Sequence, residues 1–168
     1  PNGLFETSQA IKDELDSMDI NNFTVFTSNA LVSKNEDGTI TINNPGKKTF
    51  SFKPENASAL MRNSAISTTH GEDVVEDLEN AGVYVINSLE STLLVNNKHK
   101  FSKLLLQKGI SSPATKLIPD DAALDDVIKS FDFPAVFKTL HGSKGVGVFK
   151  IDKRASAKGV LQALWHKG

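Results

Sequence analysis

A lysine followed by a loop with three glycines is the segment best suited to phosphate chemistry. Residues 133–138 (FPAVFK) have the apolar and aromatic content of a buried strand, and Lys138 lies at its end. Gly142, Gly145 and Gly147 follow within a stretch of six residues, and a second strand-like run comes after them. Glycines allow backbone N–H groups to approach an anion closely, and a lysine adds a compact, mobile positive charge. The pattern therefore predicts a phosphate-binding loop between two strands.

The order of the glycines excludes two common nucleotide-binding motifs. Gly-x-x-Gly-x-Gly is neither a Walker A loop nor a dinucleotide-binding fingerprint, and both of those motifs lead into a helix rather than a strand. Taken alone, the loop leaves one alternative open. It could be a flexible hairpin turn whose glycines serve only geometry, with Lys138 and Lys144 in solvent.

Helices and strands alternate before residue 90, which favours a layered αβ unit. Hydrophobic spacing predicts helices over 7–18 and 71–81, and strands over 23–27, 39–43, 49–53 and 83–86. The turn signals DG at 37–38 and NPG at 44–46 predict that the strands around them form a hairpin or meander.

The elements after residue 90 form a second group around the glycine loop. They are a basic helix over 97–108, a short strand over 115–118, a helix that begins at 119–121, strands over 133–137 and 146–151, and a last helix over 156–165. We therefore expect an α/β (α+β) fold with two domains, divided near residue 90.

The composition is that of an ordinary globular domain, with 39% hydrophobic and 23% charged residues. No apolar run approaches the roughly 20 residues that span a bilayer, so we expect no membrane partner and a cytoplasmic location. With 19 basic and 20 acidic residues, no overall field favours nucleic acid. Because the sequence has no cysteine, disulfides, thiolate catalysis and cysteine-ligated zinc are excluded.

Further residues, in order along the chain, extend the pattern around the loop. They are Asn97-Lys98 at the start of the basic helix, then Gly109-Ile110, Pro113 and Thr115, and finally Lys138, Gly142, Gly145, Gly147 and Val148. This ordered set resembles the ATP-grasp superfamily, and within it the ligases that add glutamate to ribosomal protein S6 and their glutathione-synthetase-like relatives. The resemblance covers roughly residues 59–168. The family prefers Asp-Lys where this chain has Asn97-Lys98.

The resemblance implies an enzyme, an ATP-grasp carboxylate–amine ligase that makes an amide or peptide bond through an acylphosphate. It implies that Lys98 and Lys138 contact the phosphates of ATP. Arg62 would face the acidic substrate or the phosphoryl group, although a surface arginine is an equally good reading. The loop that would close over the phosphates as a lid consists of Gly142, Ser143, Lys144, Gly145, Val146 and Gly147.

The resemblance also implies that the chain is an incomplete part of such a ligase. Residues 1–90 would be a small domain of the kind that precedes the ATP-grasp fold, and residues 91–168 its first, mostly antiparallel subdomain. The ligands of Mg²⁺ and the adenine-contacting strand are expected outside this segment, which would be inactive alone. The substrates would be ATP, a carboxylate and an amine, carried by an amino acid, a peptide or a protein terminus.

Two other functions remain alternatives at this point. One is a short nucleotide- or phosphate-binding module without catalysis, and the other is an α/β interaction domain whose lysines and glycines are coincidental. A homo-oligomer is a further expectation, because an open sheet edge could pair two copies.

Overall fold

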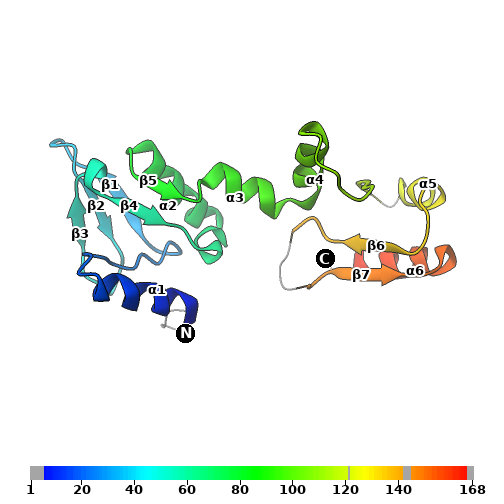
Figure 1. Cartoon of the computed structure of the whole chain (residues 1–168), viewed down its shortest axis with the longest axis horizontal. Helices are drawn as coiled ribbons and strands as arrows, with labels where there is room; N and C mark the ends of the chain where they lie inside the picture. Colours follow the sequence, from blue (N-terminus) through cyan, green and yellow to red (C-terminus); the bar gives the residue numbers. More distant parts are fainter. Residues whose placement is uncertain (1–5, 121, 142–144, 166–168) are drawn as a thin grey trace. The chain divides into compact units, whose positions relative to one another are not determined.

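The structure of the chain is a computed structural model, and it describes residues 6–120, 122–141 and 145–165. The chain divides into two compact units, Pro1–Leu89 and Glu90–Gly168 (Figure 1). Each unit combines helices with strands, so the mixed α/β class expected from the sequence is confirmed. Within the described ranges, no helix is both long and apolar enough to cross a membrane.

The first unit contains two sheets. Its elements are α1 (Glu6–Ser17), β1 (Leu31–Lys34), β2 (Ile40–Asn43), β3 (Phe50–Phe52), the 3-10 turn η1 (Pro54–Asn56), β4 (Ser58–Leu60), the 3-10 turn η2 (Asn63–Ile66), α2 (Thr69–Asn80) and β5 (Tyr84–Ile86). β1, β2 and β3 form an antiparallel meander, and β4 pairs with β5 in parallel. The hairpin predicted from the two turn signals is therefore present.

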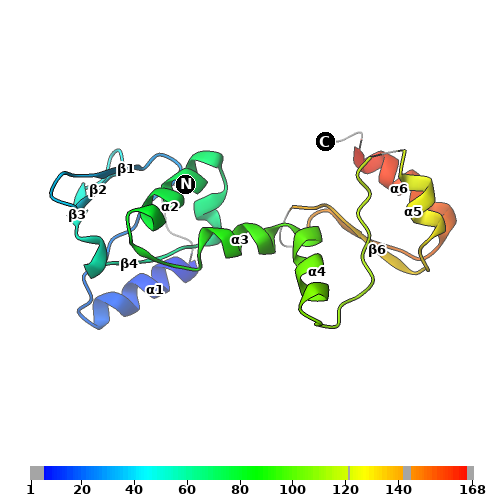
Figure 2. The same ribbon diagram turned by 90° about the horizontal axis from the view of Figure 1, so that it is seen from above.

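Helix α2, which Figure 2 shows from above, contributes an apolar stripe to the core of the first unit. Its apolar stripe, Val74, Val75 and Leu78, is buried together with Ile40 and Ile42 of the meander. Gly71 allows the helix to come very close to η2, because a Cβ at this position would overlap with the Ala65 carbonyl oxygen. The close packing of α2 against η2 therefore depends on the absence of a side chain at Gly71.

The predicted strand over 23–27 is wrong. Asn44, which is buried at 3% exposure, holds this segment with its side-chain amide instead. Its Oδ1 accepts the Phe26 N–H at 2.7 Å, and its Nδ2 donates to the Phe26 carbonyl at 3.1 Å. Phe23 stacks on Phe50 with 3.9 Å between ring centroids. One side chain therefore makes the two hydrogen bonds that a neighbouring strand would have made.

The second unit contains a hairpin and its covering helices. Its elements are α3 (Leu89–Asn96), α4 (Lys98–Gln107), α5 (Leu124–Lys129), β6 (Ala135–Lys138), β7 (Val148–Ile151) and α6 (Arg154–Trp165). Helix α3 was not predicted, and the strand predicted over 115–118 is wrong, since these residues have no strand partner in the part of the chain that is described. The helix expected from 119–121 begins only at Leu124, because the Asp120 carboxylate binds the Ala123 N–H in a preceding turn.

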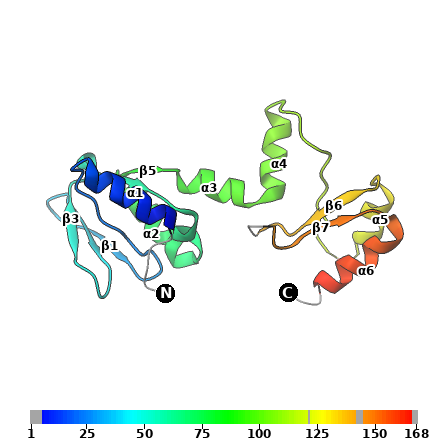
Figure 3. The ribbon, with the colours of Figure 1, turned by 60° about the horizontal axis from the view of Figure 1, so that its bottom comes forward.

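One face of the β6–β7 hairpin is covered by α5 and α6, which lie on the same side of it in Figure 3. Ile151 of β7 is buried with Leu124 and Ile128 of α5 and with Ala157 and Leu161 of α6. The opposite face of the hairpin is exposed.

The two units differ strongly in charge. Pro1–Leu89 has 13 acidic and 6 basic residues, whereas Glu90–Gly168 has 7 acidic and 13 basic residues. Their formal net charges of −7 and +6 together give the −1 of the whole chain. The balanced total of the sequence thus conceals one acidic unit and one basic unit.

Candidate functional site

Lys138 is the last residue of β6, as the sequence predicts, and its side chain is exposed. It lies opposite Val148, the first residue of β7. The pairing continues one step beyond the strands, because the Thr139 N–H donates to the Gly147 carbonyl at 2.9 Å. The two strands therefore hold both ends of the glycine loop in a fixed register.

Gly147 is required by the packing at the base of the loop. Its φ is +73°, and a Cβ here would lie 2.5 Å from the Thr139 Oγ1 and 2.8 Å from the Thr139 Cγ2. Gly145 also has a positive φ, +76°, but a Cβ on it would meet nothing within 4 Å. Val146 between them is 74% exposed. The three other residues proposed for the lid, Gly142, Ser143 and Lys144, lie outside the described residues.

The start of α4 contacts the same loop. Asn97 caps the helix, with its side-chain oxygen accepting the Lys100 N–H at 3.0 Å. The backbone N–H of Lys98 donates to the Leu140 carbonyl at 3.2 Å, and the Lys98 Nζ lies 3.4 Å from the same oxygen. Two segments 42 residues apart are thus joined at the exit of β6. The positive end of the α4 dipole and the Lys98 ammonium both lie beside the loop.

The role of Asn97 as a helix cap explains why this chain can have Asn97-Lys98 where the family prefers Asp-Lys. Asparagine and aspartate cap helices about equally well, because either side-chain oxygen can accept an N–H of the first turn. The substitution keeps the geometry of the helix start and removes one negative charge next to Lys98. A site for an anion gains from that change.

Sequence reasoning did not single out Thr139 or Leu140. In these two contacts both act through the backbone, because the Thr139 N–H donates to the Gly147 carbonyl and the Leu140 carbonyl accepts from Lys98. Backbone donors and acceptors are present whatever the residue type. The only sequence signal for Thr139 and Leu140 was that they directly follow Lys138.

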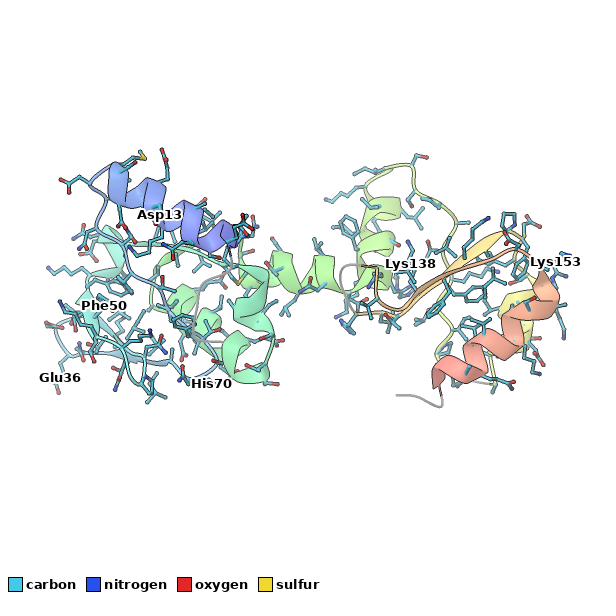
Figure 4. All side chains as sticks on the ribbon, turned by 90° about the horizontal axis from the view of Figure 1, so that it is seen from below. Asp13, Glu36, Phe50, His70, Lys138 and Lys153 are labelled. Carbon is cyan, nitrogen blue, oxygen red and sulfur yellow. The ribbon has the colours of Figure 1, made fainter. Side chains whose placement is uncertain are left out.

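Arg62, which the resemblance assigns to an anion, and His70 both lie in the first unit. Arg62 follows β4 and is exposed, and its role stays a prediction. His70 is labelled in Figure 4, and its Nε2 lies 2.9 Å from the Ala30 carbonyl oxygen. That contact ties α2 to the start of β1 and gives His70 a structural role.

The described residues contain no group of three or more His, Cys, Asp or Glu side chains able to hold a metal ion. The carboxylates at the start of α5 follow the ordinary pattern of helix ends, where acidic groups favour the first turn. This part of the chain therefore offers lysines and backbone groups to an anion, and no ready site for Mg²⁺.

The hairpin with a lysine at its exit, the described part of the glycine loop and the adjoining helix start lie in a segment that is similar to ATP-grasp proteins. Residues 95–167 match the RimK-like ATP-grasp domain, which confirms the resemblance drawn from the sequence for this part of the chain.

Two curated relatives that the chain matches are named as ligases. The chain is 30% identical over 120 residues to a "Probable alpha-L-glutamate ligase" of Haemophilus influenzae (strain PittEE), covering 71% of this chain and 40% of the relative. It is 32% identical over 126 residues to a protein of the same name from Thioalkalivibrio sulfidiphilus, covering 73% and 40%. The similarity is thus to ligases, and the chain spans about 40% of the length of these relatives.

Proposed function

We propose that this chain is the phosphate-handling part of an ATP-dependent carboxylate–amine ligase that forms an amide bond through an acylphosphate. The contact of Lys98 with the Leu140 carbonyl carries the proposal. It supports a single phosphate site made by the α4 start, Lys138 and the glycine loop. A hairpin turn with solvated lysines gives no reason for a helix start to bind its loop.

The chemistry needs charge neutralisation more than covalent help from the protein. A carboxylate oxygen of the substrate attacks the γ-phosphorus of ATP, and the bond to the bridging oxygen breaks, leaving ADP. The amine nitrogen then attacks the acyl carbon, the acyl C–O bond breaks, phosphate leaves with the electron pair, and the amine loses a proton. Lys98 and Lys138 would stabilise the negative charge on the phosphates throughout.

The glycine loop would close over the phosphates and exclude water. Water exclusion protects the acylphosphate from hydrolysis, which would waste ATP without forming the amide. Positive φ values at Gly145 and Gly147 turn successive backbone N–H groups in directions that suit an anion-binding concavity.

Magnesium is the usual partner of ATP in such enzymes. The described residues supply no carboxylate cluster for it, so no step of this proposal is assigned to a metal ligand of this chain. The word "glutamate" in the names of the relatives supports an amino acid as one of the two substrates joined.

Chemical-shift titration of the ¹⁵N-labelled chain with ATP and ADP tests the proposal, because it also measures millimolar affinities. The amide signals of Thr139 and Gly147 should move with ligand. Lys138→Gln should weaken ATP binding at least about tenfold, as expected for loss of a charge-assisted contact. Lys129→Gln is the matched control, because Lys129 is also exposed but lies on α5. Absence of any shift at the loop, or equal affinity of the Lys138 variant, would refute the proposal.

A further inference from the structure

A small hollow opens at one end of the interface between α2 and the meander of the first unit. It has a volume of about 200 Å³. Its walls come from β1, β2 and the C-terminal end of α2, and its lining residues are Val32, Lys34, Ile40, Asp77, Asn80 and Ala81. Pockets that hold drug-sized ligands measure about 300–1,000 Å³. This hollow therefore suits a smaller molecule, of about the size of one amino acid.

The floor of the hollow is apolar because it continues the core. Ile40 is fully buried, and Val32 and Ala81 pack against the same core cluster. Lys34 is two residues after Val32 on β1 and pairs directly with Ile40, so it lies on the core-facing side of the sheet. Its side chain is exposed all the same. The sheet thus places a lysine where its apolar row reaches solvent.

Helix α2 contributes the opposite charge to the hollow. Asp77 follows the buried Val74 by three residues, and Asn80 follows Asp77 by three, so the three share one side of the helix. Asp77 and Asn80 are both exposed. The C-terminal end of a helix adds a partial negative charge. The helix side of the hollow therefore favours a cation, whereas Lys34 on the sheet side favours an anion.

The two charges do not neutralise each other. Among the residues that the structure describes, neither Lys34 nor Asp77 forms an ion pair. Both nevertheless line the same small volume. A ligand that carries an anionic and a cationic group a few bonds apart can pair with both residues at once.

We propose that this hollow binds a free amino acid with an aliphatic side chain. The α-carboxylate pairs with Lys34, the α-ammonium group pairs with Asp77 beside the Asn80 amide, and the side chain covers the apolar floor at Ile40. A second charge on the ligand would lie against apolar groups without a partner, which is costly. The inference goes beyond the proposed function, because none of the lining residues belongs to the candidate phosphate site.

Chemical-shift titration of the ¹⁵N-labelled chain with L-leucine tests the inference. The amide signals of Lys34, Asn80 and Ala81 should move and reach saturation. L-glutamate should bind at least about threefold more weakly, because its second carboxylate meets the apolar floor.

Two analogues of L-leucine separate the two charges. N-acetyl-L-leucine lacks the ammonium group, and L-leucinamide lacks the carboxylate. Lys34→Gln should weaken L-leucine and N-acetyl-L-leucine about two- to fivefold, as expected for an exposed ion pair, and leave L-leucinamide unchanged. Asp77→Asn should weaken L-leucine and L-leucinamide by a similar factor and leave N-acetyl-L-leucine unchanged.

Lys48→Gln and Asp73→Asn are the matched controls. Both residues are exposed and lie outside the hollow, and Asp73 is one turn before Asp77 on α2. If a control weakens L-leucine as much as its partner variant does, the effect comes from overall charge and the site is wrong.

Three other results would also overturn the inference. One is the absence of saturable shifts around the hollow, and another is equal weakening of both analogues by each variant. Equal affinity for L-glutamate would refute the aliphatic class of ligand. The proposed function is tested separately, because ATP binding and Lys138 take no part in these measurements.

Discussion

Replacing Gly147 by alanine tests the close packing at the base of the glycine loop. The new methyl group would lie 2.5 Å from the Thr139 Oγ1, well inside the range that real Cβ contacts allow. The backbone there has φ +73°, which L-residues other than glycine adopt only at a cost. Thr139 cannot simply move away, because its N–H is bonded to the Gly147 carbonyl.

The expected loss in free energy of unfolding has two parts. The left-handed backbone costs an alanine about 1–2 kcal/mol, and forcing a group into an occupied space costs typically about 1–3 kcal/mol. Gly147→Ala should therefore lower the free energy of unfolding by about 2–5 kcal/mol. Gly145→Ala is the matched control, because it shares the positive φ but has open space around the new Cβ. Gly145→Ala should cost only the about 1–2 kcal/mol of the left-handed backbone.

Urea unfolding followed by tryptophan fluorescence gives the measurement. The chain has one tryptophan, Trp165, and it belongs to α6 in the same unit as the loop. If the two alanine variants unfold at the same urea concentration, steric overlap with Thr139 plays no part and the reasoning is refuted.

A double variant tests whether Thr139 is the residue that the new methyl group at position 147 would strike. Thr139→Ala removes the Oγ1 and Cγ2 that the new methyl group would strike, and leaves the Thr139 Cβ at 3.2 Å. Alone it should cost about 0.5–1.5 kcal/mol, because Oγ1 donates to the His141 carbonyl. Combined with Gly147→Ala it should cost less than the sum of the two single changes. Strict additivity would mean that the two residues do not interact.

Three further predictions concern other parts of the chain. Gly71→Ala should destabilise the first unit by about 3 kcal/mol or more, since the Ala65 carbonyl that its Cβ would strike is backbone; a urea midpoint equal to that of the unchanged chain would contradict this. Asn97→Ala should cost about 1 kcal/mol by loss of the helix cap while the aspartate variant costs almost nothing, and circular dichroism during unfolding should separate them. The pKa of Asp37 is held below its usual value by hydrogen bonds from the side chain and backbone of Thr39, so its stabilising effect is present above the unfolded-state pKa and is lost as pH falls through the lower folded-state value. Thr39→Val should return the NMR titration midpoint of Asp37 partly toward 3.8, and an unmoved midpoint would exclude the hydroxyl as the cause.

Local sequence signals predicted the elements whose stability is local. The turn signals and alternation around 39–53 gave the hairpin, and the apolar stripe of 71–81 gave α2. The strand expected over 23–27 failed because a buried amide, Asn44, lies 18 residues away in sequence and competes for its backbone. Periodicity carries no information about such a partner.

In the candidate site, too, local features were predicted and contacts between distant residues were not. The position of Lys138 at a strand exit follows from the apolar run before it, and the cap of α4 follows from Asn97. The resemblance to a family implied that Lys98 and Lys138 serve the same phosphates, but the contact of Lys98 with the Leu140 carbonyl was not predicted. It is a contact of a side chain with a distant backbone group, and no residue type or spacing in the chain encodes it.

The separation of charge between the two units has a consequence for encounter rates. A dissolved polyphosphate approaching this chain is repelled by a surface of net charge −7 and attracted by one of net charge +6. Association with the basic unit should therefore slow as salt is added, although the isoelectric point of the whole chain, about 6.5, gives no hint of it. Cut at the junction, the two halves would bind to ion-exchange resins of opposite sign.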